Sequence, residues 1–306
     1  MNNKKLIIII LVAATITAFI IFKAFTTDKN SNRIKVAILK FSDSSKSQYA
    51  NARPILNGYG FKGSFFITCS LIASAHDSPS MTWENVATLQ KEGHDIQSGS
   101  MTYAPLTNLS MSRLDYELQQ SKQCLLNHGI NAKAFGMPYG GSWNNLTIIN
   151  TVAKYYDFSV NGFSNLMYLH CDGWKNVLSS SGQQQQFDCR TYLQNGALTF
   201  ANRYSLREWN HNTFDVKYSH DNAKVFNAFV NEVNRQTPYN YYGKINAIPI
   251  IAYHNIDDKK KPNSTGITLF ADEMKYLHDN GFKVITIGDL DYDENNDFIS
   301  VVGGIT

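Results

Sequence analysis

Short apolar runs alternate with longer amphipathic segments along most of this chain. The run 34–41 is typical of a buried strand, 47–60 has helical spacing and closes on a glycine, and 61–67 is again typical of a strand. The full pattern predicts strands at 34–41, 61–67, 94–98, 132–137, 157–160, 197–206, 246–254 and 283–287, and helices at 47–60, 82–93, 112–129, 144–156, 221–235 and 269–281.

This order of elements predicts an α/β fold. Repeated β-α units imply a parallel sheet, and about eight strands with helices between most of them favour a closed or nearly closed barrel over an open sheet. In such a barrel the active groups lie in the loops that follow the strands. Ser42, Asp43, the segment 98–105, Pro138 and His254 all fall in these predicted loops.

The alternation also sets the expected domain boundaries. We expect the barrel to occupy 34–290 and the residues 291–306 to form a C-terminal tail. Residues 161–196 interrupt the pattern with glycine, serine, asparagine and a glutamine tract at 183–186. We interpret 161–196 as an excursion from the barrel rather than a separate domain.

The N-terminus has the pattern of a membrane segment. A short basic start at 1–5 precedes an apolar run at 6–22, which as a helix would be about 25 Å long, enough for a thin bilayer. No clear cleavage site follows, so we favour an uncleaved anchor over a cleaved signal, with 23–33 as a tether. The basic start would stay in the cytoplasm, which places the remaining chain outside it.

Composition narrows the expected partners. The chain has 306 residues, is 43% hydrophobic and carries a net charge of +3 from 28 basic and 25 acidic residues. The basic residues form no stripe of the kind that a nucleic-acid groove requires, so we expect no nucleic-acid partner. The aromatic residues suit either stacking on sugars or core packing.

Export would allow the cysteines to form disulfides. Cys171 and Cys189 lie in one loop-like region, where a disulfide would hold together an insertion of low apolar content. Zinc is the weaker interpretation of these two residues, because neither belongs to a C-x-x-C pair. Cys69 and Cys124 lie in apolar patterns and are expected to be buried thiols or a second bridge.

Four segments carry a resemblance to a known family. They are "KFSDSSKSQYANARPILNGYGFKGSFFI", "GHDIQSGSMTYAPLTNLS", "FGMPYGGSWNN", and "PIIAYHNID" followed by "FADEMKYLHDNGFKVITIGDL". In this order and spacing they resemble the motifs of the polysaccharide deacetylase family, the NodB-homology domains of carbohydrate esterase family four. The resemblance covers 34–160 well and 246–290 less closely, and it implies an irregular (β/α) barrel.

The resemblance implies that several active-site residues are substituted. The family's first motif ends in two aspartates, a general base and a metal ligand, and here Ser42 stands at the base position while Asp43 keeps the ligand. The second motif contributes two histidine ligands, whose positions are occupied by Gly99 and Tyr103, with Ser100 retained between them. By the resemblance, Asp43 is the only surviving ligand of a zinc site.

Two further motifs survive in part. The family's Arg-x-Pro-x-Gly motif corresponds to "GMPYG" at 136–140, which lacks the arginine, and its general-acid histidine corresponds to His254. The family's Asp/Trp motif has no certain counterpart, and Trp174 or Trp209 could supply its aromatic wall. The residues expected in a substrate groove are Ser100, Pro138, Tyr139, Gly140 and Trp209.

Other potential ligands are better explained by structural roles. His94 matches a family position that is usually not a ligand. The remaining candidates lie in solvated loops or beside the expected Cys171–Cys189 bridge, namely His76, Asp77, His170 and Asp172. Tyr103 could bind an ion only if its pKa fell far below about 10, and it is more simply expected to fill the space of the missing imidazole.

These observations predict a membrane-anchored, outward-facing, deacetylase-like protein that is catalytically degenerate and binds a glycan or acts as a scaffold, with no cofactor. Loss of a general base typically costs about 10²–10⁴ in rate, and Asp43 alone is not expected to hold zinc. One alternative is an active hydrolase that removes N-acetyl groups from a polysaccharide with zinc or another divalent metal in a rearranged site. Another is an envelope protein whose barrel serves only protein contacts.

Overall fold

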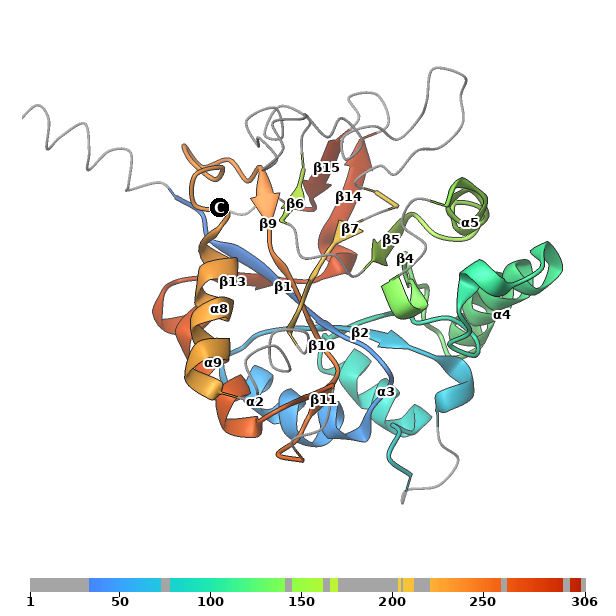
Figure 1. Ribbon diagram of the computed structural model, residues 1–306, viewed down its shortest axis with the longest axis horizontal. Coiled ribbons are helices and arrows are strands. Elements are labelled where there is room, and N and C mark those ends of the chain that lie inside the picture. The colour runs from blue at the N-terminus through green and yellow to red at the C-terminus, as the bar shows by residue number, and fades with distance from the viewer. Residues whose placement is uncertain are drawn as a thin grey trace, which may run out of the picture.

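The structure, a computed structural model, describes residues 33–72, 78–140, 145–161, 166–169, 203–204, 206–211, 221–259, 263–293 and 298–303. Within them a nine-stranded sheet has the order β7-β5-β4-β3-β2-β1-β10-β8, and β13 also pairs with β1. All pairs in this sheet are parallel. Figure 1 shows the strands with helices packed around them. The predicted parallel α/β sheet is confirmed.

The strands of the sheet follow the apolar runs of the sequence. β1 (Val36–Phe41) is buried along its whole length and lies at the centre, because β2, β10 and β13 all pair with it. The other strands of the sheet are β2 (Ser64–Ile67), β3 (Asp95–Ser98), β4 (Ala134–Gly136), β5 (Phe158–Asn161), β7 (Leu206–Arg207), β8 (Trp209–Asn210), β10 (Ile250–Tyr253) and β13 (Lys283–Ile285). An unbroken apolar run is typical of a strand buried on both faces.

The sheet comes close to closing into a barrel. Its two edge strands, β7 and β8, are separated in the chain by Glu208 alone. A single short segment therefore forms both edges of the sheet. The expectation of a closed or nearly closed barrel is met by this arrangement.

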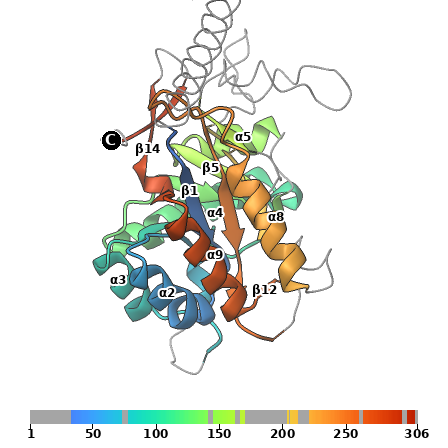
Figure 2. The same ribbon diagram turned by 90° about the vertical axis from the view of Figure 1, so that its left-hand side faces the viewer.

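The helices lie outside the sheet and begin at capping residues that the sequence provides. Thr82 and Ser110 accept hydrogen bonds from backbone N–H groups in the first turns of α3 and α4, and Asp221 does so for α8. Figure 2 shows α8 and α9 side by side on one side of the sheet. The helices are a π-helical turn η1 (Gln48–Ala52), α2 (Arg53–Gly58), α3 (Trp83–Lys91), α4 (Met111–Asn127), α5 (Leu146–Val152), α8 (Asn222–Asn234) and α9 (Ile267–Asp279).

Short strand pairs stand apart from the main sheet. β6 (Met167–Tyr168), inside the predicted excursion, pairs with β9 (Ala247–Ile248), and β11 (Asn255–Ile256) pairs with β12 (Ser264–Thr265). β14 (Leu290–Asp293) and β15 (Phe298–Val301) form an antiparallel pair where a tail was expected. Residues 298–301, which lie within the predicted tail 291–306, thus form a strand, and Ile299 is buried in the core.

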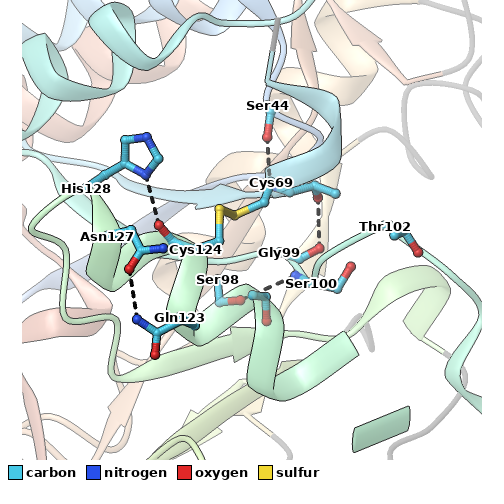
Figure 3. The surroundings of a disulfide bond; sticks show 12 residues. Ser44, Cys69, Ser98, Gly99, Ser100, Thr102, Gln123, Cys124, Asn127 and His128 are labelled. Atoms are coloured by element: carbon cyan, nitrogen blue, oxygen red, sulfur yellow. Dashed lines mark hydrogen bonds between the residues drawn. A yellow bond between two sulfur atoms is a disulfide. The ribbon is translucent and has the colours of Figure 1, made fainter. Parts of the chain in front are cut away.

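A disulfide joins Cys69 to Cys124. Cys69 begins a short turn after β2, and Cys124 lies on α4, so the bond ties the end of a central strand to an outer helix (Figure 3). Of the two expectations for these residues, the bridge is the correct one. The predicted pair Cys171 and Cys189 lies outside the described residues.

The predicted membrane segment at 6–22 also lies outside the described residues. Among the helices that the structure does describe, none is long and apolar enough to cross a bilayer. The anchor therefore stays a prediction from the sequence.

Candidate functional site

A cavity of about 430 Å³ opens at the carboxyl ends of the barrel strands. Most of the residues that line it lie at the ends of β1, β3, β4, β8 and β10 or just after them, as expected for the active side of a parallel barrel. They are Lys40, Ser42, Asp43, Phe66, Gly99, Tyr103, Gly136, Met137, Tyr139, Gly140, Glu208, Asn210, His254 and Asn263. The cavity contains all the motif positions that the resemblance marked as base, ligand or acid.

Asp43 and His254 form the closest polar contact in this lining. β1 and β10 are neighbours in register, with Phe41 opposite Tyr253, so residues just past their ends meet. The His254 Nδ1 atom lies 2.6 Å from Asp43 Oδ2. On the other side of the ring, Nε2 lies 3.4 Å from the Asn210 Nδ2 atom. The imidazole is therefore held between β8 and β1.

The charge state of Asp43 sets the direction of this bond. Burial opposes ionisation, but the hydrogen bond from His254 and its charge when protonated outweigh burial, and smaller contributions come from Tyr103 and Lys40. The pKa of Asp43 consequently lies below its ordinary value. An ionised carboxylate only accepts hydrogen bonds, so Nδ1 of His254 is the donor. Asp43 adopts a φ of 72°, and it caps no helix, because Ser47 is the residue before η1.

Gln48 fixes the backbone beneath this pair. Its Nε2 atom donates to the carbonyl oxygen of Ser42 and to that of His254, the latter at 2.6 Å. A single buried amide thus joins the residue before Asp43 to the partner of Asp43. Gln48 begins the π-helical turn η1, a type of element often found at functional sites. No sequence motif pointed to this residue.

Gly99, the first substituted ligand position, leaves no room for a side chain. A Cβ atom placed there would lie 2.9 Å from Thr68 Oγ1, 3.1 Å from the Phe66 carbonyl oxygen and 3.2 Å from the Ile67 carbonyl carbon. The first of these distances is shorter than real Cβ atoms make, and the other two are tighter than most real Cβ contacts, so a side chain there would require its neighbours to shift. The position is therefore closed by neighbouring atoms as well as lacking an imidazole.

Tyr103, the second substituted position, lies in the lining with a φ of 61°. Burial first, and then the charge of Asp43, raise the pKa of the Tyr103 phenol far above its ordinary value. The phenol also lowers the pKa of Asp43, yet Oδ1 of Asp43 has no hydrogen-bond partner in the described part of the chain. The Tyr103 phenol thus lies close enough to Asp43 for each group to shift the pKa of the other, and Tyr103 stays protonated.

A buried ion pair forms another side of the cavity. Lys40 Nζ lies 2.7 Å from Glu208 Oε2 and 3.0 Å from Oε1, and both side chains are almost fully buried. Lys40 also lies over the Phe66 ring, 5.0 Å from its centroid. Phe66 in turn packs against Gly136, where a Cβ atom would lie 2.7 Å from the ring.

The resemblance places an arginine at position 136, where this chain has a glycine. The ring of Phe66 fills the space in which a side chain at Gly136 would begin. The cation of the cavity instead comes from Lys40 on β1. Sequence reasoning missed Lys40 and Glu208 because their partnership spans 168 residues. The adjacent Trp209 was the only signal near Glu208.

Several residues expected in the groove lie elsewhere. Ser100 is buried and its Oγ accepts a hydrogen bond from the Tyr103 backbone N–H, so it shapes the loop without lining the cavity. Pro138 is also buried. Trp209 is only 2% exposed and packs edge-on against His211, so its expected role as a groove wall was wrong. Tyr139 and Gly140 do line the cavity.

Of the alternative ligands, His94 lies among the described residues, and it does not line the cavity. His94 is buried, its Nδ1 accepts a hydrogen bond from the Gly63 N–H, and its ring packs against Phe65. Burial and the charge of Lys62 lower the pKa of His94 to about 4, so it is neutral. His76, Asp77, His170, Asp172 and Trp174 lie outside the described residues.

A second histidine, His211, which the sequence analysis did not single out, forms a buried hydrogen-bond network beside the cavity. His211 Nε2 lies 2.7 Å from Glu273 Oε1, and its Nδ1 lies 2.9 Å from Thr265 Oγ1. The other Glu273 oxygen accepts a hydrogen bond from the Tyr253 hydroxyl. This buried network connects the residue after Asn210 to the residue before His254, and it thereby fixes the two ends of the Asn210–His254 contact.

The residues around Asp43 do not fit the divalent metal that the resemblance implies. Zinc needs three or four nitrogen, sulfur or carboxylate donors. Here Nδ1 of His254 donates a hydrogen bond to Asp43, Tyr103 is protonated, and Gly99 has no side chain that could bind a metal. Among the described residues, no group of three or more His, Cys, Asp or Glu side chains is arranged to hold an ion. No reaction step through a metal is therefore derived for this site.

Comparisons with known proteins agree with the fold. A mutant of BA3943, a CE4 family pseudoenzyme with restored enzymatic activity, has a TM-score of 0.51 at 11% identity, covering 84% of this chain and 67% of that one. T48 deacetylase with substrate has a TM-score of 0.50 at 15% identity, covering 83% and 89%. A family 4 carbohydrate esterase from Streptomyces lividans, in complex with acetate, has 0.50 at 13%, covering 88% and 98%.

At these identities the likeness to solved structures establishes the fold alone. A comparison with curated proteins found no match. The model of the family described as polysaccharide deacetylase matches residues 29–159, which include β1 to β4, the Asp43 loop and the segment from Gly99 to Tyr103. Residues 29–159 therefore belong to the polysaccharide deacetylase family.

Proposed function

We propose that this protein binds a glycan at the barrel mouth without carrying out metal-dependent deacetylation. The observation that carries the proposal is the engagement of Asp43 by His254, 2.6 Å away, at a site where Gly99 and Tyr103 supply no further ligand. A metal-dependent hydrolase needs an ion to polarise the carbonyl and to activate water. The residues present supply hydrogen-bonding groups in place of an ion site.

The cavity has the composition of a sugar-binding site. Tyr139 is 69% exposed at its rim and can stack on the apolar face of a sugar ring. Its ring lies 5.2 Å from that of Tyr103, which supports it from one side. The polar groups of Asp43, Asn210 and His254 face the same space and can exchange hydrogen bonds with sugar hydroxyls.

The relatives support this proposal in two ways. One solved structure of similar fold is a deacetylase with substrate, and another belongs to a CE4 family pseudoenzyme whose mutant has restored enzymatic activity. The fold thus occurs both in a deacetylase that holds a substrate and in a pseudoenzyme. For this chain, glycan binding and catalytic degeneracy rest on its own residues.

We place the barrel outside the cytoplasm, held at the membrane by residues 6–22. The apolar run and the basic residues before it support an anchor of this orientation. The Cys69–Cys124 disulfide supports it independently, because such bonds persist in oxidising compartments. Fractionation of cells that express the full chain, with protease added from outside, tests this location.

Glycan binding is tested by titrating the full chain in detergent with chitin oligomers and with other N-acylated polysaccharides, after dialysis against a metal chelator. The expected result is saturable binding that added zinc leaves unchanged. Lack of binding to every glycan would favour the scaffold alternative. Binding that depends on zinc and is followed by acetate release would instead establish the active hydrolase.

A further inference from the structure

The tight space around position 99 is formed by a short segment at the end of β2 and just after it. Residues 67–70 run beside 99–101 and are joined to them by backbone hydrogen bonds, from Gly99 N–H to the Ile67 oxygen at 2.8 Å and from Ser70 N–H to the Met101 oxygen at 2.9 Å. Between these bonds, Thr68 Oγ1 donates to the Gly99 oxygen at 2.8 Å. The two segments therefore lie at a fixed and short separation.

Thr68 is the only side chain among the three closest neighbours of position 99. Its Oγ1 atom lies 2.9 Å from the site of a Cβ, whereas the other two near atoms belong to the backbone of Phe66 and Ile67. Thr68 is fully buried, and its N–H donates to Ser44 Oγ at 2.9 Å. The hydroxyl cannot turn away without giving up its bond to Gly99.

The disulfide prevents the segment from moving back as a unit. Cys69, the next residue, is bonded to Cys124 on α4, and its N–H donates to the Ser100 oxygen at 3.3 Å (Figure 3). Around Cys124 on the same helix, the side chains of Ser121 and Leu125 are buried. Moving Thr68 away from Gly99 would therefore also require the packed helix α4 to move.

We propose that Thr68 is the residue that excludes a side chain, and hence a metal ligand, from position 99. This inference rests on the proposed function, because it explains why the site lacks a metal. It adds that restoring the substituted motif residues is not enough to regain metal binding. Thr68 must be shortened as well.

The steric part of the inference is tested by stability, without any metal. Gly99→Ala adds only a Cβ at a position whose φ is acceptable for alanine. In the native background we expect the unfolding equilibrium constant to rise by about tenfold to a hundredfold, as for other overpacked sites. In a Thr68→Ala background the same change should be clearly less destabilising, and the cost that remains should come from the backbone atoms of Phe66 and Ile67. Thr68→Ser keeps the hydroxyl and is the matched control, so there the full effect should return.

The double-mutant comparison also removes the effect of losing the Thr68–Gly99 hydrogen bond, since that loss is present in both Thr68→Ala variants. Two results overturn the inference. One is a Gly99→Ala change that is harmless in the native background. The other is a change that is equally destabilising with Thr68→Ala.

The metal part is tested with zinc alone, using full chains that carry Ser42→Asp, Gly99→His and Tyr103→His. Zinc affinity is measured by competition with a chromophoric chelator, and ligand geometry by the visible spectrum of bound cobalt. We expect the affinity to rise at least about tenfold when Thr68→Ala is added, by analogy with the effect of supporting residues in other metal sites. Adding Thr68→Ser instead should produce no rise.

Equal zinc affinity with and without Thr68→Ala overturns this inference while leaving the proposed function intact. Tight zinc binding by the native chain would instead overturn the proposed function. The two failures are thus distinguished by which chain binds the ion.

Discussion

The His254 imidazole donates from Nδ1 to the Asp43 carboxylate across the ends of two neighbouring parallel strands, with 2.6 Å between the two atoms. This bond engages the one metal ligand that the family resemblance leaves in place. It also holds the histidine that the resemblance assigns as general acid. Two residues that would serve different steps of a hydrolytic reaction are here partners of each other.

Removing the charge of Asp43 is expected to weaken glycan binding. Hydrogen bonds to charged groups contribute about 1.5–3 kcal/mol, so Asp43→Asn should raise the dissociation constant by about tenfold to a hundredfold. Calorimetric titration of the full chain in the presence of a chelator measures this change. Asp272→Asn, at an exposed position on α9, is the matched control and should leave the affinity unaltered. An unchanged affinity for Asp43→Asn would remove Asp43 from the binding site.

Breaking the Lys40–Glu208 pair is expected to destabilise the barrel strongly. Both groups are almost fully buried, so Lys40→Met leaves an uncompensated carboxylate, which typically costs about 3–5 kcal/mol. The double variant Lys40→Met with Glu208→Leu removes both charges and should recover much of that loss. Guanidinium denaturation provides the free energies of unfolding. If the double variant is no more stable than Lys40→Met, the ion pair is not the cause.

An exposed ion pair serves as the control for the denaturation experiment. Lys275 and Asp279 form an exposed pair on α9, one turn apart. Exposed pairs contribute little to stability because water screens them, so Lys275→Met should leave the free energy of unfolding nearly unchanged.

The sequence predicted the order of strands and helices well because each strand of the barrel is a local apolar run with a helix beside it. It also placed Asp43 and His254 in loops that follow strands of one parallel sheet, but it did not predict the hydrogen bond between them. The prediction was weakest where a partner is distant in the chain. Lys40 and Glu208 are far apart, and Glu208 lies between two strands of only two residues each.

The other differences between the predictions from the sequence and the structure concern which side chains the fold buries. An aromatic residue near a barrel end can line a groove or pack beneath it, and in the fold Trp209 is buried in the core beside His211. Cysteine pairing is likewise set by the fold, which brings the end of β2 to α4. The tightness of the space at Gly99 depends on the neighbouring strand, which no local pattern reveals.

The stability of the protein should depend on pH through His94. Its pKa is about 4 in the folded protein and 6.5 for the free side chain, so between these values the unfolded chain binds the proton more readily. The contribution of neutral His94 to the free energy of unfolding is fully present above pH 6.5. It is lost as the pH falls towards 4, and the loss amounts to at most about 3 kcal/mol. Denaturation curves at pH 7 and pH 4.5 measure the difference.

Two variants isolate this effect. His94→Asn keeps an acceptor for the Gly63 N–H and should reduce the difference between the two pH values. His278→Asn alters an exposed histidine on α9 and should preserve it. An undiminished pH dependence in His94→Asn would show that other groups cause it.

Removing the Cys69–Cys124 bond is expected to lower the free energy of unfolding by about 2–4 kcal/mol, because the bond closes a long loop in the unfolded chain. The variant carrying both Cys69→Ala and Cys124→Ala avoids leaving a free thiol. A non-reducing peptide map should first recover the bridged peptides from the native chain. Failure to recover them, or equal stability of the variant, would contradict the assigned pairing.

The central claim is that the barrel mouth holds no metal and carries out no metal-dependent deacetylation. It is tested most directly by dialysing the purified full chain against zinc, cobalt or nickel and measuring bound ion and acetate release from chitin oligomers in the same sample. We expect no stoichiometric ion and no acetate above the blank. One tightly bound equivalent of metal, together with acetate release that Asp43→Ala abolishes, would contradict it.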